Sequence, residues 1–161
     1  MPDTPEGPTP ASAGRSSLPL ALLATACVVA LGIWWIVRSG ERRALDEALS
    51  AYGGTPLPTA DTPIDPALAD LGATVFGARC AGCHALRGAA KLAPNLAGIT
   101  LARDPAWLRA MILRPDSMTR DDPIARALLD AYDVRMQVAG GMDGSATRAV
   151  MEFLRRADGG S

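Results

Sequence analysis

The residues best suited to carry chemistry lie together at positions 80–84, in the short sequence CAGCH. This stretch holds two of the chain's three cysteines and its single histidine. In a Cys-x-x-Cys-His sequence, both thiols can form thioethers with the vinyl groups of one porphyrin, and the histidine can bind the iron. Cysteines three positions apart lie on one face of a helical turn, which brings both sulfurs to the same cofactor. The stretch therefore predicts one covalent haem c, attached at Cys80 and Cys83, with His84 as the proximal axial ligand.

Two other kinds of site also use closely spaced cysteines. A thiol–disulfide oxidoreductase has its reactive pair at the N-terminus of a helix, where the helix dipole lowers the thiol pKa. Here the pair follows a helical pattern, and no strand–helix–strand pattern surrounds it. A structural zinc site needs four nitrogen or sulfur ligands, whereas residues 67–161 contain two cysteines and one histidine. A membrane-tethered Cys-x-x-Cys oxidoreductase or metallochaperone is the alternative to haem binding.

The charge and the remaining motifs exclude other classes of partner. The formal net charge is -1, and no strongly basic segment is present. Nucleic-acid binding proteins usually carry a basic face, so no nucleic acid is expected. The glycine-rich patterns that cradle phosphates are also missing from the sequence, so we expect no small-molecule substrate of that kind.

An apolar segment near the N-terminus predicts a membrane anchor. Residues 18–37 contain no charged side chain. As a helix they would span roughly 30 Å, the thickness of the hydrocarbon core of a bilayer. Trp34 and Trp35 lie near one end, where interfacial aromatic residues are common. A cleaved signal peptide is the alternative, with an Ala-x-Ala site at residues 24–26 or a lipoprotein-type site at Cys27, but further apolar residues follow both sites.

Composition divides the rest of the chain into three parts. Residues 1–17 are rich in proline, serine and glycine, and we expect them to be disordered. Residues 38–66 combine a charged juxtamembrane segment, expected to be a short helix, with a proline-rich linker. From residue 51 onward that linker would reach roughly 50 Å as a semi-rigid tether. Residues 67–161 form the predicted folded domain.

The signals in this domain are all helical. Asp65, Asp104 and Asp122 each precede a proline, a combination that predicts a helix N-cap followed by the first helical residue. Ser145 is expected to cap the last helix, and Pro115 is expected to stop the second. No alternating strand pattern of useful length appears, so we predict an all-α domain of three or four helices.

Residues 69–156 resemble the class I monohaem cytochrome c family, in particular its membrane-anchored bacterial members. The resembling segments are GATVFGARCAGCH, APNLAGI, DPAWLRAMILRPDSM, DDPIARALLDAYDVRMQ and MEFLRR. The resemblance implies a class I cytochrome c fold, in which a few helices surround a covalent haem. It also implies that the first and last helices of the domain cross, with Gly72, Phe76 and Phe153 at the crossing.

The resemblance assigns roles to two more residues around the haem. The carbonyl oxygen of Pro94 would accept a hydrogen bond from Nδ1–H of His84, which orients the imidazole and strengthens its donation to iron. Without the resemblance, Pro94 would be read as a turn residue. Trp107 would line the haem pocket near a propionate or fill the core.

The sixth iron ligand is expected to be a methionine sulfur. Met111 and Met151 lie within predicted helices and are expected in the core, whereas Met118, Met136 and Met142 lie in predicted loops. In the resembling cytochromes the ligand follows the Ala-Tyr helix and precedes the last helix, which assigns Met136. The family usually has Met-Pro here and this chain has Met-Gln, so Met118 stays an alternative and Met142 ranks third.

These features together predict an electron-transfer protein and not an enzyme. An iron with histidine and methionine as axial ligands has no open position for a substrate, so single electrons would pass through the exposed haem edge. The expected donor is a quinol-oxidising complex, and the expected acceptor is a terminal oxidase or reductase. The protein would act as a tethered carrier or as a fixed subunit of such a complex.

The charges beside the anchor bear on its orientation. Arg15 precedes the anchor, whereas Arg38, Arg42 and Arg43 follow it, so the positive-inside rule would place the domain in the cytoplasm. Covalent haem attachment normally takes place outside the cytoplasm, and long domains cross a membrane largely regardless of flanking charge. We therefore expect a single pass through the bacterial cytoplasmic membrane, with the haem domain on the periplasmic side.

Overall fold

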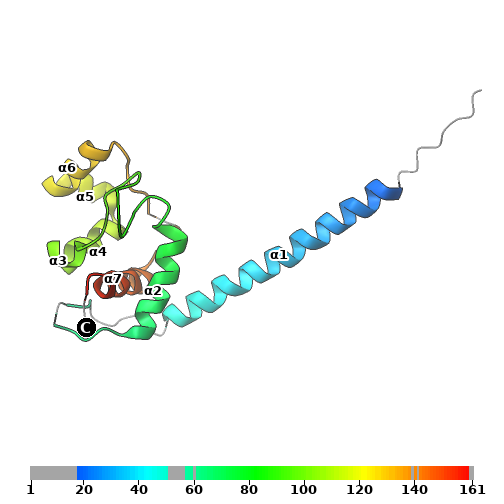
Figure 1. Ribbon diagram of the computed structural model, residues 1–161, viewed down its shortest axis with the longest axis horizontal. Helices are drawn as coiled ribbons and strands as arrows, with labels where there is room; N and C mark the ends of the chain where they lie inside the picture. The colour runs from blue at the N-terminus through cyan, green and yellow to red at the C-terminus, as the bar shows by residue number, and fades with distance from the viewer. Residues whose placement is uncertain (1–17, 51–56, 60, 139, 141, 160–161) are drawn as a thin grey trace, which may run out of the picture. The chain divides into compact units, whose positions relative to one another are not determined.

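The computed structural model describes residues 18–50, 57–59, 61–138, 140 and 142–159. Within them the helices are α1 (Leu18–Ser50), α2 (Pro66–Arg79), α3 (Ile99–Ala102), α4 (Pro105–Leu113), α5 (Pro115–Asp121), α6 (Pro123–Tyr132) and α7 (Gly144–Ala157) (Figure 1). No strand occurs among these residues, so the predicted all-α class is confirmed. The segment predicted to be disordered, residues 1–17, lies outside the described residues.

The chain divides into two compact units between Arg42 and Arg43, and this division falls within helix α1. Residues Leu22–Ser50 of this helix are long and apolar enough to cross a membrane, judged by length and composition. The large apolar side chains of residues 22–37 are exposed, including Trp34 (61%) and Trp35 (65%). Helix α1 is continuous to Ser50, so the short helix predicted after residue 38 is its C-terminal part.

The Asp-Pro pairs begin three helices, as predicted. The side chain of Asp65 accepts a hydrogen bond from the backbone N–H of Leu68, and Asp104 caps α4 in the same way. Asp122 caps α6, and its pKa is lowered mainly because its carboxylate accepts a hydrogen bond from the N–H of Ala125. Each cap satisfies a backbone donor that has no partner inside its helix.

One prediction about a helix end was wrong, and the predicted number of helices in the domain was too low, although α4 does end just before Pro115 as predicted. Asp143, not Ser145, caps α7, since its carboxylate accepts from the N–H of Ala146 (2.8 Å) and from the hydroxyl of Ser145 (2.7 Å). These hydrogen bonds, above all the one from Ala146, lower the pKa of Asp143. Pro115 follows the end of α4 but also begins α5, so the domain has more helices than predicted. Helices as short as α3 and α5 contain too few residues for an apolar repeat to reveal them.

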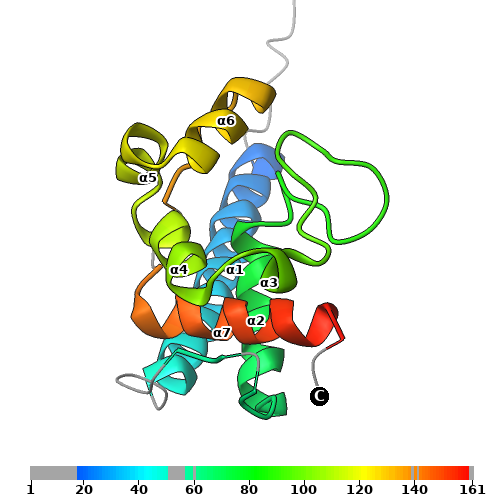
Figure 2. The same cartoon turned by 90° about the vertical axis from the view of Figure 1, so that its left-hand side faces the viewer.

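The domain core forms where α7 crosses α2 (Figure 2). A Cβ atom on Gly72 would lie 1.9 Å from the carbonyl oxygen of Ala149 and 2.9 Å from Cβ of Phe153. Glycine is therefore required at this position for the two backbones to approach so closely. The rings of Phe76 and Phe153 pack beside it with centroids 5.3 Å apart. The buried core consists of Leu49, Leu68, Val75, Phe76, Ala146, Ala149, Val150 and Leu154.

A buried ion pair on α7 holds the segment that enters α2. Arg155 donates to Glu152 over 2.8 Å, and the side chains of these residues are 9% and 3% exposed. Glu152 also accepts from the backbone N–H of Asp65 (2.7 Å), and Arg155 donates to the carbonyl of Thr62. Residues 62–65 of the predicted linker are thus bound to the domain, whereas residues 51–56 and 60 lie outside the described residues.

Candidate haem attachment site

The two cysteines and the histidine lie on one backbone turn that continues from α2. Cys80 is the C-cap of the helix, and its N–H donates to the carbonyl of Phe76 (2.8 Å). The backbone N–H groups of Cys83 and His84 both donate to the carbonyl of Cys80, over 3.1 and 2.9 Å. Cys80 is half-buried against the core, and Cys83 is exposed. The turn therefore fixes all three side chains in one short segment next to the core.

The imidazole of His84 is oriented by the loop that follows. Its Nδ1 lies 2.9 Å from the carbonyl oxygen of Pro94. A carbonyl can only accept, so Nδ1 carries the proton and Nε2 has a free lone pair. Among the described residues, Nε2 has no hydrogen-bond partner, which leaves it available to a metal ion. The contact that the resemblance implied is present in the structure, and its role toward iron stays a prediction.

A side chain that the sequence analysis did not single out, Asn95, shapes this loop. Its Nδ2 donates to the carbonyl of Gly88 (2.7 Å), and its Oδ1 accepts from the N–H of Ala97 (2.8 Å). The N–H of Leu96 donates to the carbonyl of Ala85 (2.8 Å), which returns the loop to the attachment turn. Proline and asparagine are both common in turns, so the Pro-Asn pair in the sequence could have predicted a turn here.

Asp158, at the C-terminal end of α7, holds the other end of the loop. Its carboxylate accepts from the N–H groups of Gly98 (2.7 Å) and Thr100 (2.9 Å) and from the hydroxyl of Thr100 (2.7 Å). Gly98 has φ 73, a conformation that favours glycine. Because the carboxylate comes from the far end of the domain, no local pattern in the sequence indicates this contact.

The environment of the thiols disfavours the oxidoreductase alternative. Burial raises the pKa of the Cys80 thiol, and the positive charge of Arg79 only partly opposes this effect. Cys80 also lies at the C-terminal end of α2, where the helix dipole destabilises a thiolate. Reactive thiols of redox enzymes have the opposite environment, a helix N-terminus and a lowered pKa. The described residues contain no cluster of three histidine, cysteine or acidic side chains suited to a metal ion.

Two buried donors near the start of α4 fit a group with carboxylates. Nε of Arg103 and Nε1 of Trp107 are buried, and neither makes a hydrogen bond of normal geometry. The guanidinium of Arg103 lies over the indole of Trp107, 5.5 Å from its centroid. An interaction with the Trp107 side chain also helps to lower the pKa of Asp122, but no hydrogen bond of normal geometry satisfies the indole N–H. Buried donors usually have an acceptor, and haem propionates would supply one.

The structure separates the candidate methionines. Met136 is half-buried in the irregular segment after α6, and its assignment as the distal ligand stays a prediction. Met118, which was expected in a loop, lies within α5. Met142 packs against the core, and its sulfur lies 3.7 Å from a guanidinium nitrogen of Arg79. Met151 is buried in α7, as predicted for a core residue, whereas Met111 lies in α4 as predicted but is only half-buried.

The helical domain and its Cys-x-x-Cys-His turn define a protein that binds haem covalently. The family model for cytochrome c matches residues 69–158, so the chain belongs to the cytochrome c family. This confirms the resemblance, the class I cytochrome c fold and the covalent haem c. It also makes the chain an electron-transfer protein.

Solved structures of the same family have the same fold. The chain is similar to a cytochrome c from Rhodothermus marinus, with 26% identity and a TM-score of 0.59, over 69% of this chain and 94% of that chain. It is also similar to an engineered form of the Rhodothermus marinus cytochrome c, with 25% identity and a TM-score of 0.58, over 71% of this chain and 97% of that chain. No curated protein sequence matches the chain.

Proposed function

We propose that the protein is a membrane-anchored monohaem cytochrome that passes single electrons between respiratory complexes. A quinol-oxidising complex would be the donor, and a terminal oxidase or reductase would be the acceptor. The observation that carries the proposal is the turn at residues 80–84, where two cysteines stand beside a histidine whose Nδ1 is bonded to the carbonyl of Pro94. This arrangement serves an iron that stays bound while its charge changes.

Each protein group has a separate task in this proposal. Haem c, when bound, supplies a one-electron couple between Fe(II) and Fe(III). Cys80 and Cys83 retain the macrocycle by thioethers, and the hydrogen bond to Pro94 directs Nε2 of His84 toward the metal. The side chains of Arg103 and Trp107 would donate to the propionates. A methionine sulfur would close the remaining coordination position, which would keep substrates from the iron, so no enzymatic turnover is expected.

Membrane anchoring is supported by the exposed apolar part of α1. A continuous run of exposed apolar side chains is unfavourable in water and favourable in lipid. Trp34 lies under the guanidinium of Arg38 at 5.9 Å, near the end of the apolar run, and both residue types are common at membrane interfaces. We place the haem domain on the periplasmic side of a bacterial cytoplasmic membrane, because haem attachment outweighs the flanking arginines.

Part of the segment predicted as juxtamembrane helix and linker packs on the haem domain, which favours the fixed-subunit form of the proposal. Residues 43–50 of α1 belong to the same compact unit as the haem domain, and Leu49 is 3% exposed in its core. Glu152 and Arg155 bind the segment at residues 62–65. A blue-native gel of membranes in mild detergent separates the two forms: a fixed subunit migrates with a large complex, and a tethered carrier migrates alone.

The distal ligand is tested by comparing two alanine variants of the full-length protein. We expect Met136→Ala to lose the red absorption band of methionine-ligated ferric haem. Its potential should fall by roughly 0.1–0.3 V, because a thioether ligand favours Fe(II). Met118→Ala should keep both properties. Absorption spectroscopy and a redox titration in detergent measure them, and the reverse pattern would assign the ligand to Met118.

A further inference from the structure

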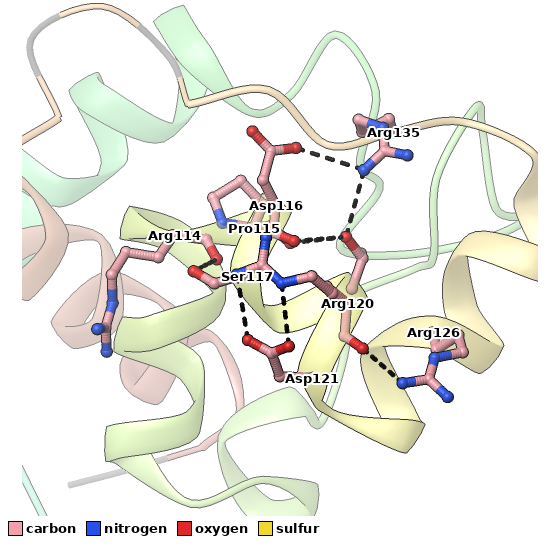
Figure 3. A network of polar contacts seen from close by, with 9 residues as sticks. Arg114, Pro115, Asp116, Ser117, Arg120, Asp121, Arg126 and Arg135 are labelled. Carbon is pink, nitrogen blue, oxygen red and sulfur yellow. Dashed lines mark hydrogen bonds and ion pairs between the residues drawn. The ribbon is translucent and has the colours of Figure 1, made fainter.

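The segment that carries Met136 is fastened to α5 by the side chain just before the methionine. One guanidinium nitrogen of Arg135 lies 3.4 Å from Oδ1 of Asp116 (Figure 3). The same nitrogen lies 3.4 Å from Oγ1 of Thr119. Both acceptors belong to α5, whereas Arg135 lies beyond the end of α6. The side chain thus joins two parts of the domain that are not adjacent in the sequence.

The acceptor side of this contact is firmly held. Thr119 is only 7% exposed, and its hydroxyl donates to the carbonyl of Pro115 over 2.9 Å. A hydroxyl has a single proton, so the lone pairs of Thr119 stay available to accept from Arg135. Pro115 is fully buried at the start of α5, which fixes the helix to its surroundings. Arg135 therefore reaches a buried, immobilised acceptor and an exposed carboxylate at the same time.

Residues 134–138, the segment that contains Met136, have few other attachments. Asp133, with φ 51, ends α6, and no helix begins again until α7. Among the described residues, Arg135 alone makes hydrogen bonds from residues 134–138 to another helix. Burial holds the segment only in part, because Met136 is half-buried whereas Val134 and Val138 are 42% and 46% exposed. Without Arg135, few contacts in the described structure would fix the position of Met136 relative to α5.

We propose that Arg135 is a positioning residue for the distal ligand, which keeps Met136 in place by fastening its segment to α5. The inference rests on the proposed function, because it takes Met136 as the ligand. The ion pair with Asp116 is exposed, with side chains 53% and 77% accessible, and such pairs contribute little in water. The contact with buried Thr119 gives the attachment its geometry. A change at Arg135 should therefore loosen the methionine without unfolding the domain.

Imidazole, which competes with methionine for ferric haem, is the probe. We expect Arg135→Ala in the full-length holoprotein to raise the apparent affinity for imidazole by about three- to fivefold, the effect of one lost surface contact. Arg120→Ala is the matched control. It removes the same charge from α5, and its ion pair with the adjacent Asp121 lies elsewhere in the same network (Figure 3). It should leave the affinity within about twofold.

Two further variants separate the possible failures. Arg135→Lys keeps the charge but not the planar fork, and should give an intermediate imidazole affinity. If Arg135→Ala binds imidazole like the wild type while Met136→Ala binds it far more tightly, the role of Arg135 is overturned and the proposed ligand stands. If Met136→Ala itself changes nothing, the ligand assignment fails and the inference fails with it. Equal effects of Arg135→Ala and Arg120→Ala would mean that only charge matters, which also overturns the role.

Discussion

Gly72→Ala is expected to lower the melting temperature of the haem domain by about 10 °C or more, the effect of overpacking a tight helix crossing in a domain of this size. The added methyl group would lie 1.9 Å from the carbonyl oxygen of Ala149, a backbone atom that cannot rotate away. Helices α2 and α7 would have to separate, and the packing of Phe76 on Phe153 would loosen with them. Circular dichroism during heating of the full-length protein in detergent measures the change.

Gly77→Ala is the matched control for this prediction. Gly77 lies on the same helix, but a Cβ atom there would meet no atom within 4 Å. Alanine favours a helix over glycine by about 0.5–1 kcal/mol, so this variant should melt at or slightly above the wild-type temperature. If both variants melted alike, the close crossing would not be what requires glycine at position 72.

Glu152→Ala is the second substitution with a large expected effect, a loss of about 3–5 kcal/mol in the free energy of unfolding. It would leave the guanidinium of Arg155 buried without its carboxylate, and the N–H of Asp65 without its acceptor. An unpaired buried charge costs much more than the pair itself contributes. Urea denaturation of the full-length protein, followed by circular dichroism, measures the loss.

An exposed ion pair between α7 and α2 provides the control. Arg156 and Asp70 lie at the same 2.8 Å separation, but their side chains are 36% and 74% exposed. Asp70→Ala should therefore cost no more than about 1 kcal/mol. Equal losses in the two variants would show that the burial of Glu152 and Arg155 adds nothing to the stability of the domain.

The parts of this structure that local chemistry determines could be predicted from the sequence. Each Asp-Pro pair is followed by a helix, because the carboxylate satisfies a free N–H and proline favours the first turn. The Cys-x-x-Cys-His stretch is equally local, since one turn contains the whole attachment site. The contact between His84 and Pro94 spans ten residues, and only the family resemblance pointed to it.

Contacts between distant parts of the chain could not be predicted in the same way. Asp158 reaches Gly98, and Glu152 reaches Asp65, across most of the domain, and neither carboxylate differs in the sequence from an exposed surface residue. Nothing local indicates that Thr119 is buried or that Arg135 lies beside it. The misassigned cap of α7 has a smaller cause, since Asp143 and Ser145 are both good capping residues two positions apart.

The attachment of haem through Cys80 and Cys83 is tested most directly by the mass of the denatured protein, produced in a bacterium that assembles c-type cytochromes. After extraction with acidified acetone, which removes haem that is not covalently bound, the wild-type chain should weigh its amino acids plus one haem. It should also give the pyridine haemochrome spectrum of haem c, and Cys80→Ser with Cys83→Ser should lose both properties. A wild-type mass equal to the polypeptide alone, with both thiols free to titrate, would contradict the account.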